Sequence, residues 1–270
     1  MLKTKDGINL FTQSWKATDP KAIVVLTHGF GEHSSRYPHV GKALSQAGYS
    51  LYTYDLRGHG QSGGPRGHTP AYESLLDDLE AVIADAKSDQ PGKKVFVYGH
   101  SMGGNITLNY ALRRPSGLSG VITTGAWLKL AFDPPALQLA LGRLMANLIP
   151  TFAQQSNLDV NALSHDPAIS KAYAEDKLVH STITARLFVE IVGAGEYALA
   201  HAAELTLPVL LMHGGGDLII SPGGTRQFHE RATVADKTIR MYDGLFHEIH
   251  NELEQATVFK DMIEWLNRHC

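Results

Sequence analysis

Cysteine is almost absent from the chain, since the only one among 270 residues is Cys270, the last residue. A single cysteine excludes a disulfide framework and a thiolate metal site within the chain. The longest apolar stretch, residues 134–152, is interrupted by Gln138, Arg143 and Asn147, so it is poorly suited to crossing a bilayer. The first residues have no apolar core of the kind that a signal peptide needs. We therefore expect a cytoplasmic protein.

The chain also has no large excess of charge of one sign, because it contains 24 Lys and Arg residues and 27 Asp and Glu residues. The sequence has no basic stripe of the kind that binds nucleic acid. The Gly-rich loops lack the two sequence patterns that cradle phosphates, Gly-x-x-x-x-Gly-Lys and Gly-x-Gly-x-x-Gly after a strand. His33 and His39 have no acidic partners in a metal-binding pattern. We expect neither a metal nor a cofactor.

What is present is an alternation of strand-like and helix-like segments. Residues 23–27 form a continuous apolar run, which is typical of a strand buried on both faces of a parallel sheet. Residues 72–87 carry apolar side chains at helical spacing. Further strands are predicted at residues 8–15 (an edge strand), 49–54, 95–98, 120–124, 208–212 and 238–242, and further helices at 39–47, 106–114 and 254–267. This order predicts an α/β fold with a mostly parallel central sheet and helices on both faces.

The alternation is interrupted between residues 126 and 205. Helical patterns prevail there, at residues 134–149, 167–174 and 182–202. We therefore expect a core formed by residues 1–126 and 206–270, with residues 127–205 inserted as a helical cap. Such an insertion lies over the carboxyl ends of the strands, where ligands bind in open α/β sheets.

The segment 95–104 carries the strongest chemical signal. A β-prone apolar run ends in Gly-x-Ser-x-Gly at residues 99–103, and helix-forming residues follow. Gly99 and Gly103 have no side chain that would collide in so tight a turn, and Ser101 projects above the sheet. This is the nucleophile elbow of an α/β-hydrolase, which predicts acyl transfer through Ser101.

A serine nucleophile needs a base and an acid that orients the base, and α/β-hydrolases place them in the chain order Ser, acid, His. Asp217 is the only carboxylate in the loop after the strand at 208–212, and His247 follows the strand at 238–242. Asp243 is a weaker candidate for the acid because it shares a loop with the histidine. His250 is the rival to His247, and we interpret it as a residue of the pocket wall.

The oxyanion hole should combine two backbone N–H groups. One belongs to Met102, directly after the nucleophile, and the other to Phe30 in the loop at residues 28–33. The alternative is that residues 28–33 form a Gly-rich turn without this role.

Four motifs together resemble the monoacylglycerol lipase and lysophospholipase family of α/β-hydrolases. They occupy residues 28–37 (His-Gly-Phe-Gly-Glu-His-Ser-Ser-Arg-Tyr), 55–62, 99–104 and 246–250. The resemblance covers nearly the whole chain and includes cap segments at 163–167 and 176–180. It implies hydrolysis of one ester bond in a small lipid such as a monoacylglycerol, through an acyl-serine intermediate and without a cofactor.

The resemblance also implies that Glu32, Arg36 and His250 hold the glycerol moiety. The alternative is that Glu32 and Arg36 form an ion pair that fixes the loop. Two positions depart from the family pattern: Lys177 stands where proline is common, and Phe30 replaces a smaller residue. The bulk of Phe30 leaves the preferred acyl chain length open.

Apolar residues of the cap are candidates for an acyl channel, although such a stripe is also typical of packing within a cap. They are Leu137, Leu141, Leu144, Leu148 and Ile149. An apolar cap would also allow transient contact with a membrane or lipid surface, and hence a peripheral location. The sequence does not indicate the oligomeric state.

Other functions use the same residues. A lysophospholipase and a broad short-chain carboxylesterase would need the same triad. A ligand-binding receptor with a hydrolase fold is the non-enzymatic alternative, but such receptors usually lose a triad member, whereas this chain retains all three.

Overall fold

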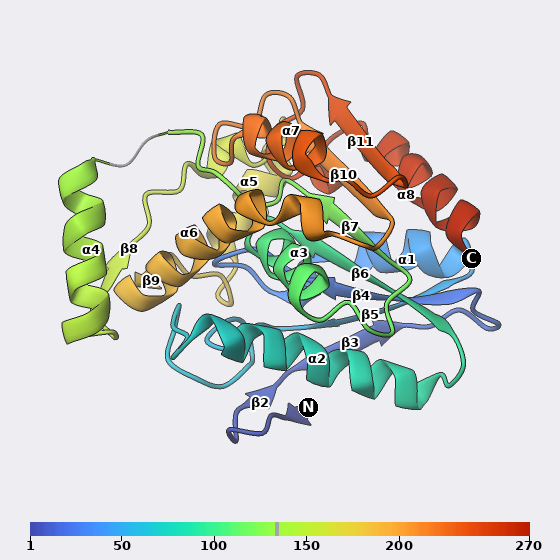
Figure 1. The fold of residues 1–270 in the computed structure, drawn as a ribbon, viewed down its shortest axis with the longest axis horizontal. Helices are drawn as coiled ribbons and strands as arrows, with labels where there is room; N and C mark the ends of the chain where they lie inside the picture. The colour runs from blue at the N-terminus through green and yellow to red at the C-terminus, as the bar shows by residue number, and fades with distance from the viewer. Residues whose placement is uncertain (133–134) are drawn as a thin grey trace.

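Figure 1 shows the computed structural model of the chain, which describes residues 1–132 and 135–270, with the side chains of residues 136–138 also outside the description. Seven strands form the central sheet in the order β11-β10-β7-β6-β4-β5-β3. Their bounds are β3 Thr12–Trp15, β4 Ala22–Thr27, β5 Tyr49–Tyr54, β6 Lys94–His100, β7 Gly120–Thr124, β10 Val209–Gly214 and β11 Lys237–Tyr242. All neighbours pair in parallel except β3, which lies antiparallel to β5. The mostly parallel sheet agrees with the prediction.

The predicted edge strand at residues 8–15 is divided in two. Its first part, β2 (Asn9–Leu10), leaves the sheet and pairs with β1 (Leu2–Lys3). The backbone N–H of Phe11 donates to Ser62 Oγ (2.8 Å) and not to a strand. The ladder is therefore interrupted at Phe11, and only β3 continues the sheet.

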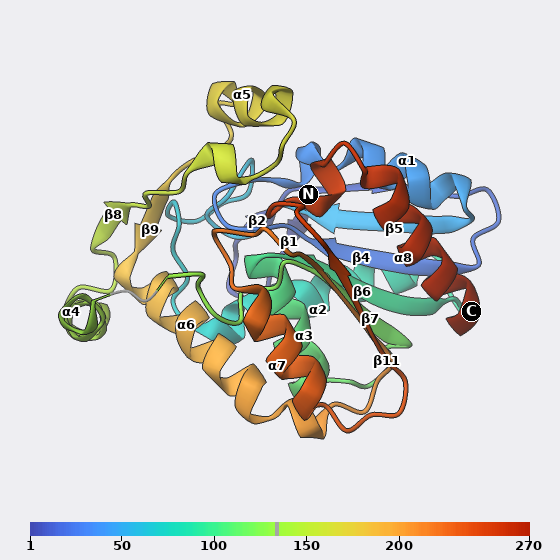
Figure 2. The same ribbon diagram turned by 90° about the horizontal axis from the view of Figure 1, so that it is seen from above.

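Helices cover both faces of the sheet, as predicted (Figure 2). One face carries α1 (Pro38–Gln46) and α8 (Gln255–His269); the other carries α2 (Tyr72–Asp89), α3 (Met102–Arg113), α6 (Ala185–Ala200) and α7 (Pro222–Arg231). Each layer encloses its own cluster of buried apolar side chains. The sequence patterns did not predict α7, which is polar overall and buries only Gly224, Thr225 and Phe228.

The segment between β7 and α6 projects beyond the sheet. It contains α4 (Ala136–Leu148), β8 (Ala153–Gln155), α5 (Pro167–Glu175) and β9 (Thr182–Thr184). β8 and β9 pair antiparallel, a feature missed in the sequence because β8 is fully exposed and has no apolar pattern. Short 3-10 helices complete the chain at Ser34–Arg36, Val160–Ala162, Ala202–Glu204 and Ile249–Asn251.

Helix α6 lies within the range expected for the cap, yet it packs on the core. Two buried amides of α3 donate to its backbone: Asn105 Nδ2 to the Ile191 carbonyl (3.1 Å) and Asn109 Nδ2 to the Ala194 carbonyl (3.0 Å). Its buried residues belong to the same apolar cluster as those of α2 and α3. α6 is therefore part of the helical layer over the sheet, and the projecting part of the insertion ends before it.

Two glycines of α6 provide a test of this packing. A Cβ at Gly195 would lie 2.7 Å from the Leu128 carbonyl oxygen, whereas a Cβ at exposed Gly193 would meet nothing within 4 Å. Gly193→Ala should stabilise the protein by up to about 1 kcal/mol through helix propensity. Gly195→Ala should destabilise the protein by about 1–3 kcal/mol, because the added methyl group would force the backbone at Leu128 to move. Urea unfolding of both variants measures the difference, and equal stabilisation by both would contradict the packing.

Candidate active site

Ser101 lies at the turn between β6 and α3, with φ 54° and ψ −117°. It is the only residue other than glycine with positive φ in the described part of the chain. Its N–H donates to the Thr124 carbonyl (3.0 Å), and its carbonyl accepts from the N–H of Trp127 (2.9 Å). These bonds to β7 and the segment after it hold a backbone conformation that a non-glycine residue rarely adopts.

The two elbow glycines permit close backbone contacts. A Cβ at Gly103 would lie 2.0 Å from the Thr27 carbonyl oxygen at the end of β4. A Cβ at Gly99 would lie 2.2 Å from the Gly103 carbonyl oxygen. Any larger residue would push α3 away from the sheet and move Ser101.

Asp217 and His247 come together at the ends of β10 and β11. His247 Nδ1 lies 2.6 Å from Asp217 Oδ2, and both side chains are buried. His250 makes no such contact, and Asp243 is exposed. The structure thus places His247 as the partner of Asp217.

Asp217 is held by further donors. His213 Nε2 lies 3.0 Å from Oδ2, and the N–H groups of Ile219 and Ile220 donate to Oδ1 at 2.8 and 2.9 Å. His213 Nε2 also faces the Ile220 carbonyl (3.2 Å), so Nε2 must carry a proton, and Nδ1 lies 2.7 Å from Thr225 Oγ1. The sequence analysis did not identify His213 as a support for the acid.

The Asp217 loop is also bonded to the chain that leaves β7. Leu130 and Ile220 form an antiparallel bridge, flanked by bonds from Ala131 N to the Ile219 carbonyl (3.0 Å) and from Ser221 N to the Lys129 carbonyl (2.8 Å). The stem of the projecting segment is thus fixed to the loop that carries the acid.

The pair has complementary electrostatics. Burial alone would lower the pKa of His247, but the charge and hydrogen bond of Asp217 raise it above its ordinary value. Burial opposes ionisation of Asp217, yet the charge of His247 and the bonds from both histidines hold the Asp217 pKa well below its usual range. An ionised Asp217 therefore orients His247 and stabilises its protonated form.

Ser101 and His247 line one cavity of about 370 Å³ together with Phe30, although no hydrogen bond joins the two side chains in the described structure. Catalytic hydrogen bonds are often long before substrate binds. The N–H groups of Phe30 and Met102 have no acceptor among the described residues. A Cβ at Gly29 would lie 3.2 Å from Ser101 Cβ, so the loop that carries Phe30 touches the nucleophile. Two free N–H groups thus flank Ser101.

The apolar part of the cavity wall comes from several segments. Residues from the core side include Trp127, Leu130, Phe188, Ile219 and Ile220. Helix α4 contributes Leu141, Gly142 and Met145. Leu144, Leu148 and Ile149 are not among the described lining residues and are 52%, 69% and 51% exposed. Of the five acyl-channel candidates, only Leu141 is brought to the cavity, and the side chain of Leu137 lies outside the described residues.

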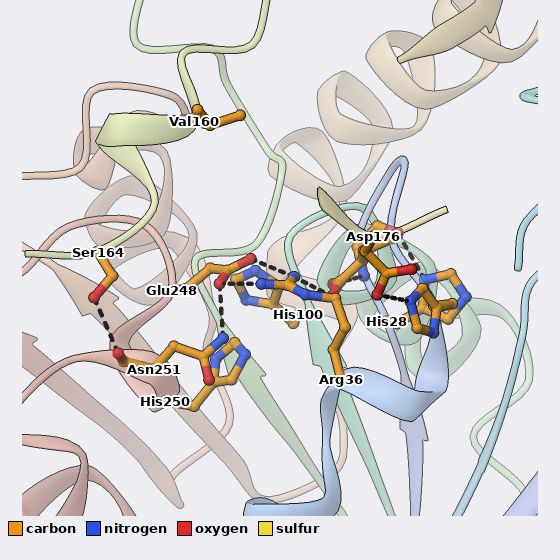
Figure 3. A network of polar contacts seen from close by, with 12 residues as sticks. His28, Arg36, His100, Val160, Ser164, Asp176, Glu248, His250 and Asn251 are labelled. Carbon is orange, nitrogen blue, oxygen red and sulfur yellow. Dashed lines mark hydrogen bonds and ion pairs between the residues drawn. The ribbon is translucent and has the colours of Figure 1, made fainter. Parts of the chain in front are cut away.

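Charged side chains form another part of the cavity wall, which we call its polar end: Glu32 and Glu248 line it, and Figure 3 shows Glu248 beside Arg36. Arg36 Nη1 donates to Glu32 Oε2 and Glu248 Oε1, both at 2.7 Å, and Nη2 donates to Glu248 Oε2 at 2.8 Å. Its guanidinium lies over the ring of Tyr173, 4.7 Å from the centroid. The ion pair between Glu32 and Arg36 is therefore present and extends to a second carboxylate.

The three residues predicted to hold glycerol differ in their access to the cavity. Glu32 lines it, whereas Arg36 and His250 are not among its described lining residues. His250 is fully buried, stacked on Tyr37 with ring centroids 5.0 Å apart. Burial, with His100 nearby, holds the His250 pKa well below its ordinary value, so its ring is neutral.

Glu248 and Tyr173 line the cavity but were not predicted as site residues. Glu248 directly follows the catalytic histidine candidate, and that adjacency was the available signal. Tyr173 lies on α5, far from the triad in sequence, and carried no signal.

No helix among the described residues is long and apolar enough to cross a membrane.

A family model described as Serine aminopeptidase, S33, matches residues 18–254.

Several curated proteins are similar to the chain. It is 34% identical over 265 residues to a monoacylglycerol lipase of Mycolicibacterium smegmatis, covering 97% of this chain and 94% of the relative. It is 33% identical over 268 residues to an uncharacterized abhydrolase domain-containing protein of Dictyostelium discoideum. That match covers 98% of this chain and only 28% of the longer relative.

Two solved structures are similar over the whole fold. A monoacylglycerol lipase of Paleococcus ferrophilus has a TM-score of 0.90 and 34% identity, covering 97% of this chain and 100% of the other. A soluble variant of the Saccharomyces cerevisiae monoglyceride lipase, in complex with a substrate analogue, has a TM-score of 0.91 and 28% identity, covering 100% and 94%. The predicted fold and the predicted family are both confirmed. The chain belongs to the monoacylglycerol lipase and lysophospholipase family of α/β-hydrolases, a family of serine ester hydrolases.

Proposed function

We propose that the protein hydrolyses monoacylglycerols to glycerol and fatty acid with Ser101, His247 and Asp217 as its triad. The observation that carries this proposal is the Asp217–His247 contact of 2.6 Å in the cavity that Ser101 also lines. The cavity joins an apolar wall to a polar end, which suits an ester with one acyl chain and one polyol.

The first step transfers the acyl group to the enzyme. Ser101 Oγ attacks the ester carbonyl carbon as its proton passes to His247 Nε2, while Nδ1–H remains bonded to Asp217. The N–H groups of Phe30 and Met102 stabilise the oxyanion. The bond between the carbonyl carbon and the glycerol oxygen then breaks, and His247 returns the proton to that oxygen.

The second step releases the fatty acid. A water molecule loses a proton to His247 as its oxygen bonds to the acyl carbon. The bond to Ser101 Oγ breaks, and Ser101 recovers the proton from His247. The enzyme is then regenerated.

The lysophospholipase alternative finds less support at the polar end. A phosphate would need a cation, but Arg36 donates to two carboxylates and is not among the described residues that line the cavity. Glu32 and Glu248, which do line the cavity, would repel the anion.

We also propose that the exposed residues Leu144 and Leu148 of α4 contact the lipid surface that holds the substrate. Both are more than half exposed, and burial of one leucine is worth about 1.5–3 kcal/mol.

The lipid contact predicts a selective loss of activity. Leu144→Ser combined with Leu148→Ser should reduce hydrolysis of monoacylglycerol in vesicles at least about tenfold, because the enzyme partitions less to the surface. Hydrolysis of water-soluble p-nitrophenyl butyrate should not change. The matched control is Asn147→Ser, a polar exposed position on the same helix. An equal loss on both substrates would contradict surface binding.

The triad predicts a ranking of variants. Ser101→Ala, Asp217→Asn and His247→Ala should each lower kcat/KM for monoacylglycerol by about a thousandfold or more, because the three residues act as a unit. His250→Ala should retain far more activity than His247→Ala. Thermal unfolding checks that each variant is folded. A reversed order of the two histidine variants would show that the base is misassigned.

The pKa of His247 predicts the pH dependence. His247 must be unprotonated to accept the serine proton, so kcat/KM should rise with pH through an apparent pKa above about 6.5. Asp217→Asn removes the charge that raises this pKa and leaves the burial that lowers it, so the apparent pKa should fall below that value. The rate of labelling by a fluorophosphonate probe, measured across pH, reports both values. An unchanged apparent pKa in the variant would rule out this origin of the shift.

A further inference from the structure

The polar end of the cavity is lined by two carboxylates that share one cation, Arg36. Glu32 and Glu248 line the cavity, and their side chains are only 3% and 2% exposed. Arg36 forms an ion pair with both and is not among the described residues that line the cavity. Figure 3 shows Glu248 facing Arg36, with Asn251 reaching Glu248 from another side.

Each described hydrogen bond to these two carboxylates uses a carboxylate oxygen as the acceptor. Glu32 Oε1 accepts from the Gly29 N–H (2.6 Å) and the Tyr37 hydroxyl (2.7 Å). Glu248 Oε2 accepts from Arg36 Nη2 (2.8 Å) and Asn251 Nδ2 (2.7 Å). Burial would raise the Glu248 pKa, but Arg36 holds it far below its usual range.

The other two carboxylate oxygens each have room for a further donor. Glu32 Oε2 and Glu248 Oε1 each accept one hydrogen bond from the described residues, in both cases from Arg36 Nη1. A carboxylate oxygen offers about two lone-pair sites. One acceptor site therefore remains on each of two oxygens that share the same guanidinium nitrogen.

Among the described residues, Arg36 is the only cation that forms an ion pair with either carboxylate. Burial lowers the His100 pKa to about 3 and holds that of His250 well below its ordinary value, so both rings are neutral. Burial raises the pKa of Tyr37 and Tyr173, so both hydroxyls are neutral as well. Two buried carboxylates thus share one guanidinium, and the neighbouring His247 is paired with Asp217. An unbalanced buried charge is costly, and a cationic ligand would offset it.

We propose that this end of the cavity selects the alcohol part of the ester by charge, so that the enzyme also hydrolyses fatty-acyl esters of ammonium-bearing amino alcohols. The inference rests on the proposed function, because the same Ser101 acyl transfer acts on both esters. The acyl–oxygen bond of the amino alcohol breaks, His247 protonates the departing oxygen, and the ammonium group is unchanged. Glu32 Oε2 and Glu248 Oε1 accept from the ammonium N–H, as they would from glycerol hydroxyls.

The test compares dodecanoyl esters of three alcohols with the wild-type enzyme. Each ester is assayed below the critical micelle concentration of that ester. The cationic ester is 2-(dimethylammonio)ethyl dodecanoate, and its neutral isostere is 3-methylbutyl dodecanoate. The anionic ester is carboxymethyl dodecanoate. We expect kcat/KM for the cationic ester to exceed that for its isostere by about tenfold, and the anionic ester to fall below the isostere by about tenfold. 1-Dodecanoylglycerol serves as the reference substrate.

Two variants locate the selecting charge. Glu248→Gln removes one carboxylate from the cavity and should reduce the ratio of cationic to isosteric kcat/KM by about tenfold. Glu254→Gln removes the same charge from an exposed position in the same segment and should leave the ratio unchanged. Because the readout is a ratio within each enzyme, a general loss of activity does not affect it.

The outcomes separate the two proposals. A wild-type ratio near one, with 1-dodecanoylglycerol still hydrolysed, overturns the charge selection and leaves the proposed function in place. A ratio that survives Glu248→Gln overturns the role of this residue. Failure to hydrolyse 1-dodecanoylglycerol overturns the proposed function itself, whatever the ratio between the other esters. If Glu248→Gln does not fold, the wild-type ester series alone decides the charge selection.

Discussion

The site depends on how closely the serine turn approaches the ends of the central strands. Ser101 has a backbone conformation that is costly for a side chain, and the contacts of Gly99 and Gly103 leave no room for a relaxed alternative. The same packing brings the loop at Gly29 against the serine. One steric constraint therefore positions the nucleophile and places the free N–H groups of Phe30 and Met102 beside it.

A second constraint is electrostatic and joins segments that are distant in sequence. Arg36 contacts Glu32 in its own loop, Glu248 beyond β11 and Tyr173 on α5. The guanidinium can satisfy both carboxylates because its planar fork donates in several directions. The polar end of the cavity is thus assembled from core and inserted residues together, and its charge is a property of the assembly.

The sequence predicted most of the elements that carry a strong pattern. Buried runs such as β4 and the amphipathic spacing of α2 are dictated by local hydrophobicity, and the triad candidates follow from motifs at strand ends. Helix α7 and strand β8 have no such pattern, because tertiary contacts determine them. Leu144 and Leu148 show why a helical stripe does not reveal its orientation: periodicity identifies an apolar face but not what that face meets. Glu248 was missed because its contact is with Arg36, which lies 212 positions away in the sequence.

The bridge between Leu130 and Ile220 affects how the projecting segment between β7 and α6, here called the lid, can be exchanged or redesigned. The strand-like stem at residues 129–131 is bonded to Ile219 and Ser221, while Ile219 and Ile220 donate to Asp217, the proposed acid of the triad. A chimaera joined upstream of this stem would replace the partner of the Asp217 loop along with the lid. A junction placed after Ala131 and before α6 would keep the acid, its loop and the helical layer as one transferable scaffold, so that lids of different length and polarity could be compared on an unaltered catalytic apparatus.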